Sequence, residues 1–135
     1  RFMISLEEGV ELVWHAFDDM KGGEIYVKKI PSMKVTDVAL AVDENTKQEE
    51  VGIRPGEKLH EQMIGIEDAL YTYEYPKHFK ILPSINDWAK DETRIGDGIR
   101  VPENFKYTSD NNKEWMKISD LQDWIEVNKN KIGNI

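Results

Sequence analysis

The sequence contains no cysteine and no long apolar run. Without cysteine, the chain has no disulfide, no thiolate nucleophile and no cysteine-ligated zinc or iron–sulfur centre. Its apolar stretches are far shorter than the roughly 18 residues that a membrane-spanning helix needs. No signal-peptide pattern opens the chain. We therefore expect no membrane association.

Positive charge is also scarce, with 18 Lys and Arg residues against 26 Asp and Glu, a net charge of −8. Such a chain repels phosphate backbones, so we expect no nucleic-acid partner. The 135 residues, 39% hydrophobic and 33% charged, are typical of one soluble globular domain over 1–135. Because the chain begins at Arg1, without an initiator Met and just before a capped helix, we expect it to be part of something larger.

The first helix has the clearest signal. Ser5 and Glu8 match a capping box, and the pair Gly22-Gly23 is expected to end the helix. Between them runs an apolar stripe at helical spacing. The stripe consists of Leu6, Val10, Val13, Trp14, Phe17 and Met20. We expect Trp14, and Trp124 in the last helix, to lie in the core.

The rest of the chain predicts short helices and strands. Strand patterns occur at 24–28, 51–53, 70–75 and 78–82. Helices are expected after Thr36 as N-cap, over 58–64, and after Ser119 as N-cap. Residues 83–113 are rich in Gly, Pro, Asn and Asp and predict a long, mostly irregular loop. The strands are too few and too short for a doubly wound sheet, so the expected fold class is α+β.

Metal-binding and catalytic motifs are weak. The three histidines, His15, His60 and His78, are scattered, so no metal site is expected. Tyr73 and Lys77 have the Tyr-x-x-x-Lys spacing of short-chain dehydrogenases, but that pair works on a helix, and a proline and a strand pattern interrupt it here.

The dinucleotide-binding fingerprint is missing as well. Gly96-Asp97-Gly98 lacks its third glycine and its strand-then-helix context. We therefore assign no catalytic residue and no cofactor-binding residue to this chain.

The turn Arg54-Pro55-Gly56-Glu57 is the best candidate binding site. A guanidinium fork such as that of Arg54 suits phosphate oxygens, and the Glu57 carboxylate can accept hydrogen bonds from sugar hydroxyls. Arg1 can supply a second positive charge. The residues alone leave open that this is only a structural corner with exposed charges.

The same turn lies in the segment Gly-Ile-Arg-Pro-Gly-Glu-Lys-Leu-His-Glu at 52–61, which resembles the C-terminal region of the inverting UDP-N-acetylglucosamine 4,6-dehydratases. These are nucleotide-sugar enzymes of the extended short-chain dehydrogenase type. The segments 1–10, 22–34 and 107–112 are similar to the same family, and 22–34 and 107–112 to its members that start pseudaminic acid synthesis. Several motifs in the same order make the resemblance specific.

The resemblance implies a two-lobed cytoplasmic enzyme that forms homo-oligomers. Its N-terminal Rossmann lobe holds NADP and the catalytic residues, and its C-terminal lobe, represented by this chain, holds UDP-N-acetylglucosamine. The resemblance also places Arg1 and Arg54 at the diphosphate of this substrate and Glu57 at its ribose or uridine. The family oxidises C4 of the sugar, eliminates water across C5–C6 and returns the hydride to C6 with inversion at C5.

Two alternatives stay open. The first alternative to the dehydratase is a stand-alone module that binds a UDP-sugar or a partner protein and has no catalytic activity. The second is part of a related UDP-sugar epimerase or dehydratase. If it is a lobe without its Rossmann partner, we expect a bare interface around Phe2, Met3 and Ile4.

Overall fold

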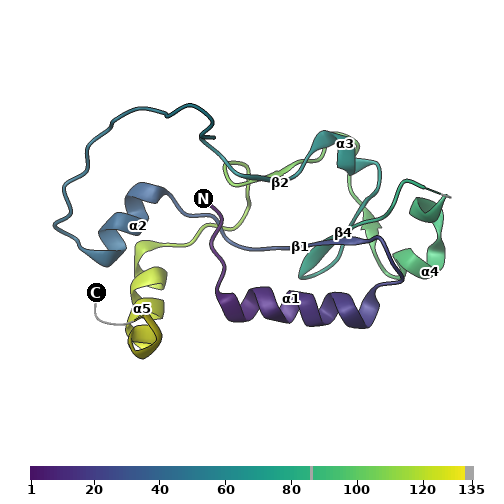
Figure 1. Ribbon diagram of the computed structural model, residues 1–135, viewed down its shortest axis with the longest axis horizontal. Helices are drawn as coiled ribbons and strands as arrows, with labels where there is room; N and C mark the ends of the chain where they lie inside the picture. The colour runs from purple at the N-terminus through teal and green to yellow at the C-terminus, as the bar shows by residue number, and fades with distance from the viewer. Residues whose placement is uncertain (86, 133–135) are drawn as a thin grey trace.

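Short helices and short strands alternate along the part of the chain that the computed structural model describes, residues 1–85 and 87–132 (Figure 1). The strands are β1 (Ile25–Lys28), β2 (Gln62–Ile64), β3 (Thr72–Glu74), β4 (His78–Ile81), β5 (Ile99–Arg100) and β6 (Tyr107–Thr108). The helices are α1 (Leu6–Asp19), α2 (Val35–Val42), α3 (Ile66–Ala69), α4 (Glu92–Ile95) and α5 (Ile118–Ile132), with a 3₁₀ turn η1 (Trp88–Lys90). The predicted α+β class is confirmed.

Two antiparallel sheets organise the fold. The larger has the strand order β1-β4-β3-β5, and the smaller pairs β2 with β6. The strands expected at 24–28, 70–75 and 78–82 are confirmed as β1, β3 and β4. The strand expected at 51–53 is wrong, because these residues lie in an exposed loop.

The helix expected over 58–64 is also wrong. Its last three residues form β2, which pairs with β6 and buries Ile64 completely. A backbone partner more than forty residues further along the chain therefore overrides the local helical pattern.

Three helix boundaries differ from the expected ones. The capping box of Ser5 and Glu8 is present, but α1 ends at Asp19, and Gly22 and Gly23 form the turn into β1 with positive φ angles of 110° and 84°. Pro83 packs so closely against Gly23 that a Cβ there would lie 2.9 Å from its ring. Only glycine fits this turn without strain.

The other two differences concern N-caps. α2 is preceded by Lys34 as its N-cap, so Thr36 lies inside the helix. α5 already begins at Ile118, and the carboxylate of Asp120 accepts a hydrogen bond from the Lys117 N–H at 2.9 Å. Ser119 is therefore not the N-cap.

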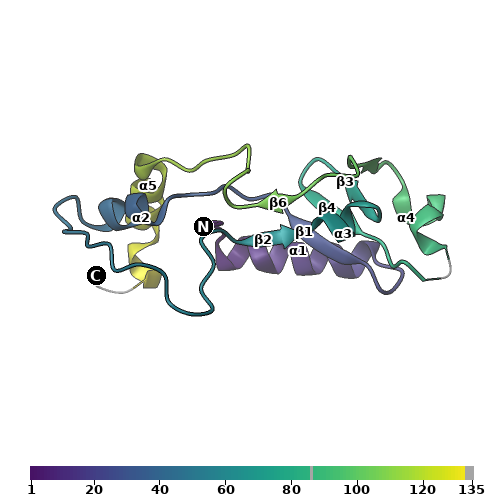
Figure 2. The ribbon, with the colours of Figure 1, turned by 90° about the horizontal axis from the view of Figure 1, so that it is seen from above.

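Apolar side chains are buried in separate clusters. The main one lies on the larger sheet and on the β2–β6 pair; its buried members are Val27, Ile64, Ala69, Phe79, Ile81, Val101 and Tyr107. A second cluster joins α2 and α5 through Met33, Ala41 and Leu121. Figure 2 shows α2 and α5 at the end of the elongated molecule opposite to the sheet. Trp124 is 41% exposed rather than in the core, so that prediction is wrong.

An amphipathic helix ordinarily buries its apolar side, but helix α1 exposes its apolar side to solvent. Its polar side faces the larger sheet, where Asp19 binds Lys80 at 2.6 Å and Glu8 lies 3.8 Å from Lys28. The whole predicted apolar stripe points outward, and Trp14 is 66% exposed. The expectation that Trp14 lies in the core is therefore wrong.

The segment expected to form a bare interface, residues 2–4, is partly packed inside the molecule. Phe2 packs on Tyr107 with ring centroids 4.8 Å apart, and Met3 packs against the cluster between α2 and α5. Ile4 is 48% exposed. The exposed apolar surface of this part of the molecule belongs to α1 instead.

Candidate functional site

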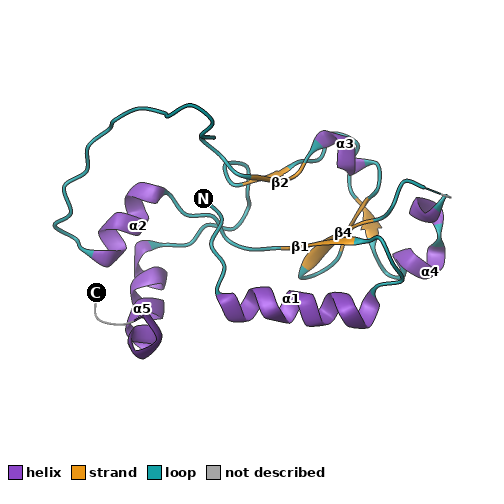
Figure 3. Ribbon diagram, viewed as in Figure 1, coloured by secondary structure: helices purple, strands orange, loops and turns teal. Residues whose placement is uncertain are grey.

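The loop that joins α2 to β2 carries the candidate turn. It has neither helix nor strand and forms a wide arc in Figure 3. Within it, the Glu57 N–H donates to the Arg54 carbonyl at 3.1 Å, and Gly56 takes a positive φ of 86°. The turn predicted at 54–57 is therefore present.

The turn brings Arg54 and Glu57 together. The Glu57 carboxylate accepts the Arg54 backbone N–H at 3.0 Å, and its other oxygen lies 3.5 Å from Arg54 Nε. The Arg54 side chain is 79% exposed. A pair this exposed contributes little to stability, so the guanidinium can exchange its carboxylate partner for an anionic ligand at low cost.

Arg1 lies against the second half of the same segment. Its Nη1 donates to the carbonyls of Lys58 at 3.1 Å and Leu59 at 3.2 Å, and lies 3.0 Å from the Glu61 carboxylate. The fold thus joins the start of the chain to the loop that carries Arg54. Three of the five guanidinium N–H donors sit on the other two nitrogens, Nε and Nη2.

The turn after β6 holds the end of this loop. Ser109 accepts the Glu61 N–H with its hydroxyl at 2.9 Å and donates its own N–H to the Glu61 carbonyl at 2.8 Å. A hydrogen bond from the Thr108 hydroxyl lowers the pKa of the Asp110 carboxyl, which lies 4.0 Å from His60. The segments 52–61 and 107–112, far apart in the sequence, are therefore neighbours.

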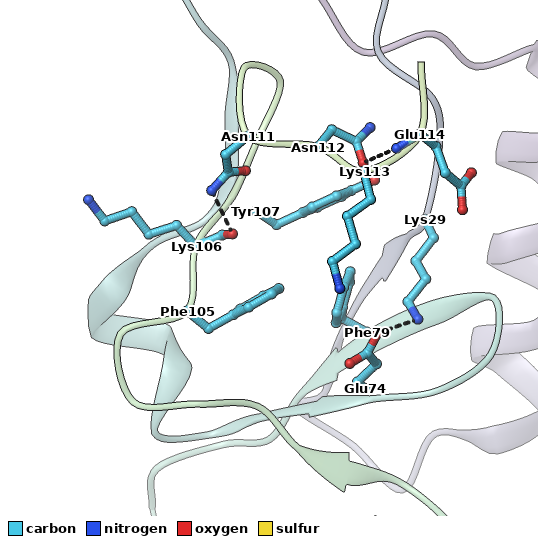
Figure 4. Close-up of a pocket in the computed structure, with 10 residues that line it drawn as sticks. All are labelled: Lys29, Glu74, Phe79, Phe105, Lys106, Tyr107, Asn111, Asn112, Lys113 and Glu114. Carbon is cyan, nitrogen blue, oxygen red and sulfur yellow. Dashed lines mark hydrogen bonds and ion pairs between the residues drawn. The ribbon is translucent and has the colours of Figure 1, made fainter. Parts of the chain in front are cut away.

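A small pocket beside β6 was not anticipated from the sequence. Figure 4 shows the rings of Phe79, Phe105 and Tyr107 at this pocket, with Lys29 bonded to Glu74 at 2.6 Å on its rim. Its volume of about 140 Å³ is below the range of small-molecule sites, so it does not hold a sugar nucleotide by itself. Its walls come from four separate segments, which no local motif could have connected.

The Tyr-x-x-x-Lys and Gly-x-Gly patterns of the sequence have structural roles. Tyr73 lies buried in β3 and Lys77 in the hairpin that leads to β4, so the pair is not on a helix. Gly96 caps α4 with a φ of 59°, and a Cβ on Gly98 would lie 2.5 Å from the Tyr75 ring. Tyr73 and Lys77 thus lack the helical arrangement of the dehydrogenase pair, and Gly96 and Gly98 lie between α4 and β5 rather than between a strand and a helix.

A family model described as polysaccharide biosynthesis protein matches residues 1–83, which is more than half of the chain. The chain belongs to the polysaccharide biosynthesis protein family. It is 45% identical over 130 residues to a UDP-N-acetylglucosamine 4,6-dehydratase (inverting) of Campylobacter jejuni, an alignment of 93% of this chain and 39% of that protein. The resemblance found in four short segments of the sequence is thereby confirmed.

More distant relatives of this polysaccharide biosynthesis chain include a UDP-glucose 4-epimerase of Rickettsia akari, 32% identical over 85 residues, which covers 60% of this chain and 25% of the epimerase. Among solved structures, Pen from Bacillus thuringiensis is similar, with a TM-score of 0.71 and 29% identity over 94% of this chain and 37% of Pen. The chain thus spans about two fifths of the length of the dehydratases it matches. Of the helices in the described residues, none has the length and apolarity to cross a membrane.

Proposed function

We propose that this chain is the nucleotide-sugar-binding part of an inverting UDP-N-acetylglucosamine 4,6-dehydratase. The observation that carries the proposal is the 45% identity to the Campylobacter jejuni dehydratase over 130 residues. The complete protein would form a UDP-4-keto-6-deoxy-hexosamine for surface glycans or flagellin glycosylation. NADP, a cytoplasmic location and a homo-oligomeric state follow from the same resemblance and form part of the proposal.

The exposed turn supplies the groups that this function requires. In the proposal, Arg54 leaves Glu57 and binds the diphosphate of the UDP-sugar, and the released Glu57 carboxylate accepts hydrogen bonds from the ribose or uridine. Arg1 contributes to the diphosphate through the donors that do not hold the loop. A guanidinium fork binds two phosphate oxygens at once, which suits a diphosphate.

The catalytic residues and the NADP site lie, in this proposal, in a Rossmann lobe outside the 135 residues. The exposed apolar face of α1 supports this arrangement. Its members are Leu6, Val10, Val13, Trp14, Phe17 and Met20, all between 43% and 82% exposed. A contiguous apolar surface of this kind marks a protein interface, and we assign it to the contact between the two lobes.

A substitution in α1 tests this contact. In the complete protein, Phe17→Ser is expected to lower the free energy of unfolding by about 1–3 kcal/mol, because it removes a large apolar side chain from a buried interface. Urea unfolding measures the effect. Val51→Ser, on the exposed loop, is the matched control and should change stability by less than about 0.5 kcal/mol. Equal effects of the two variants would contradict the contact.

The 135 residues alone are expected to be inactive. They contain neither the glycine fingerprint nor a Tyr-x-x-x-Lys helix, so the purified segment should neither bind NADP nor convert UDP-N-acetylglucosamine. Nucleotide-binding calorimetry and product chromatography test both statements. Turnover by the segment would overturn the division of roles between two lobes.

The second candidate function is that of a UDP-sugar epimerase, favoured by the 32% identity to the Rickettsia akari UDP-glucose 4-epimerase. An epimerase inverts C4 without losing water, so product mass separates the two activities. A stand-alone module is the third alternative. It predicts UDP-sugar or protein binding without any product.

A further inference from the structure

Two histidines that are 63 positions apart in the sequence meet where α1 crosses the larger sheet. His15 lies in α1 and His78 is the first residue of β4. Their Nε2 atoms are 3.4 Å apart and their ring centroids 4.6 Å apart. The spacing of histidines in the sequence gave no sign of this pair.

Aromatic neighbours orient both imidazole rings. Tyr75 stacks on His78 with centroids 4.6 Å apart and an interplanar angle of 6°. Tyr26 contacts His15 edge-on at 5.8 Å and His78 at 5.7 Å. Burial, the largest cause, together with nearby positive charge, lowers the pKa of His78 to about 4.

The pair opens into a pocket of about 410 Å³, whose wall includes Glu11 one helical turn before His15. Two of the nearby cations are paired. Lys28 lies 3.5 Å from Glu11 and 3.8 Å from Glu8, and Lys80 lies 2.6 Å from Asp19. Lys77 also lines the pocket, which has room for an ion with its water ligands.

We propose that His15 and His78 bind one divalent transition-metal ion, such as Zn²⁺, through their Nε2 atoms. Two nitrogen ligands at the usual 2.0–2.1 Å from a tetrahedral zinc lie about 3.3 Å apart, close to the separation seen here. Imidazole suits zinc, copper and nickel. Among the described residues no three His, Cys, Asp or Glu side chains form a metal-binding group, so water completes the coordination and the affinity is moderate.

Such an ion would link α1 to the sheet. His15 lies on the side of α1 that faces the sheet, opposite to the apolar stripe. The site therefore lies on a different side of α1 from the apolar face, and it does not depend on the proposed enzymatic function.

Zinc titration of the complete protein tests the site. After removal of metals with a chelator, isothermal titration should show a binding event with a Kd on the order of 10 µM. His15→Gln and the double variant with His78→Gln should lose that event. His60→Gln, the matched control for the third histidine of the chain, should keep it. Because His15 is exposed, His15→Gln leaves the fold intact, which circular dichroism verifies.

A second measurement locates the ion. On addition of Zn²⁺, the ring Cε1–H resonances of His15 and His78 should shift together while that of His60 stays in place. If His15→Gln binds Zn²⁺ as tightly as the unmodified protein, or if the unmodified protein binds none below about 1 mM, the pair is only a hydrogen bond between two imidazoles and the proposal is wrong.

Discussion

Arg54→Ala is expected to weaken binding of the UDP-sugar to the complete enzyme by about 2–4 kcal/mol, or roughly 30-fold to 900-fold in Kd. The substitution removes a charged, bidentate contact to the diphosphate and leaves the phosphate oxygens without that partner. The loop itself should keep its shape. Its turn is closed by a backbone hydrogen bond between Glu57 and Arg54 and by the glycine at 56, none of which involves the guanidinium.

Calorimetry with UDP-N-acetylglucosamine measures this loss, and two variants calibrate it. Arg100→Ala removes an exposed side chain of the same charge from β5 in the larger sheet, away from the turn, and should leave the affinity unchanged. Glu57→Gln should have a smaller effect than Arg54→Ala, because the amide keeps one acceptor oxygen. A change of less than about twofold for Arg54→Ala would contradict the assignment of the turn to the diphosphate.

Glu24→Ala should have the largest effect on stability, about 3–5 kcal/mol. Glu24 and Arg94 form an ion pair whose side chains are only 2% and 8% exposed. Arg94 also donates to the Gly22 carbonyl at 3.1 Å and stacks over Trp88 at 4.1 Å. Removing the carboxylate leaves the buried guanidinium with only Asp91 among the described residues, 3.5 Å from its Nε, as a counter-charge.

The same substitution also opens the turn before β1. The Glu24 carboxylate accepts the N–H groups of Gly22 at 2.7 Å and Lys21 at 3.2 Å, so both donors lose their partner. Thermal and urea unfolding of the complete protein measure the loss. Glu126→Ala, which breaks the exposed pair of Glu126 and Lys129 on α5, is the control and should cost less than about 1 kcal/mol. Equal losses for the two variants would show that the buried pair contributes no more to the free energy of unfolding than an exposed pair does.

Local patterns predicted the elements whose partners lie nearby. β3 and β4 form a hairpin around Pro76, and their alternating residues and the intervening proline were sufficient to locate both strands. The capping box at Ser5 and the turn at 54–57 are equally local. The candidate site followed from the same turn, and the comparisons confirm the family to which its segment pointed.

Features that depend on distant residues were missed. β2 exists because it pairs with β6, so the residues around Met63 gave a helical pattern that the fold does not use. The orientation of α1 depends on Lys28 and Lys80, whose carboxylate partners lie on its polar side. An apolar stripe ordinarily predicts burial within the domain, but the stripe of α1 is exposed, so the pattern located the helix and not the surroundings of its apolar side.

Product analysis with the complete protein tests the central claim most directly. The protein is incubated with UDP-N-acetylglucosamine and NADP, and the sugar is identified by mass and by NMR. We predict loss of one water and a UDP-linked 4-keto-6-deoxy-hexosamine with inverted C5, formed much more slowly by Arg54→Ala at subsaturating substrate. Unchanged substrate, or a C4 epimer without loss of water, would contradict the assignment of this chain to an inverting 4,6-dehydratase.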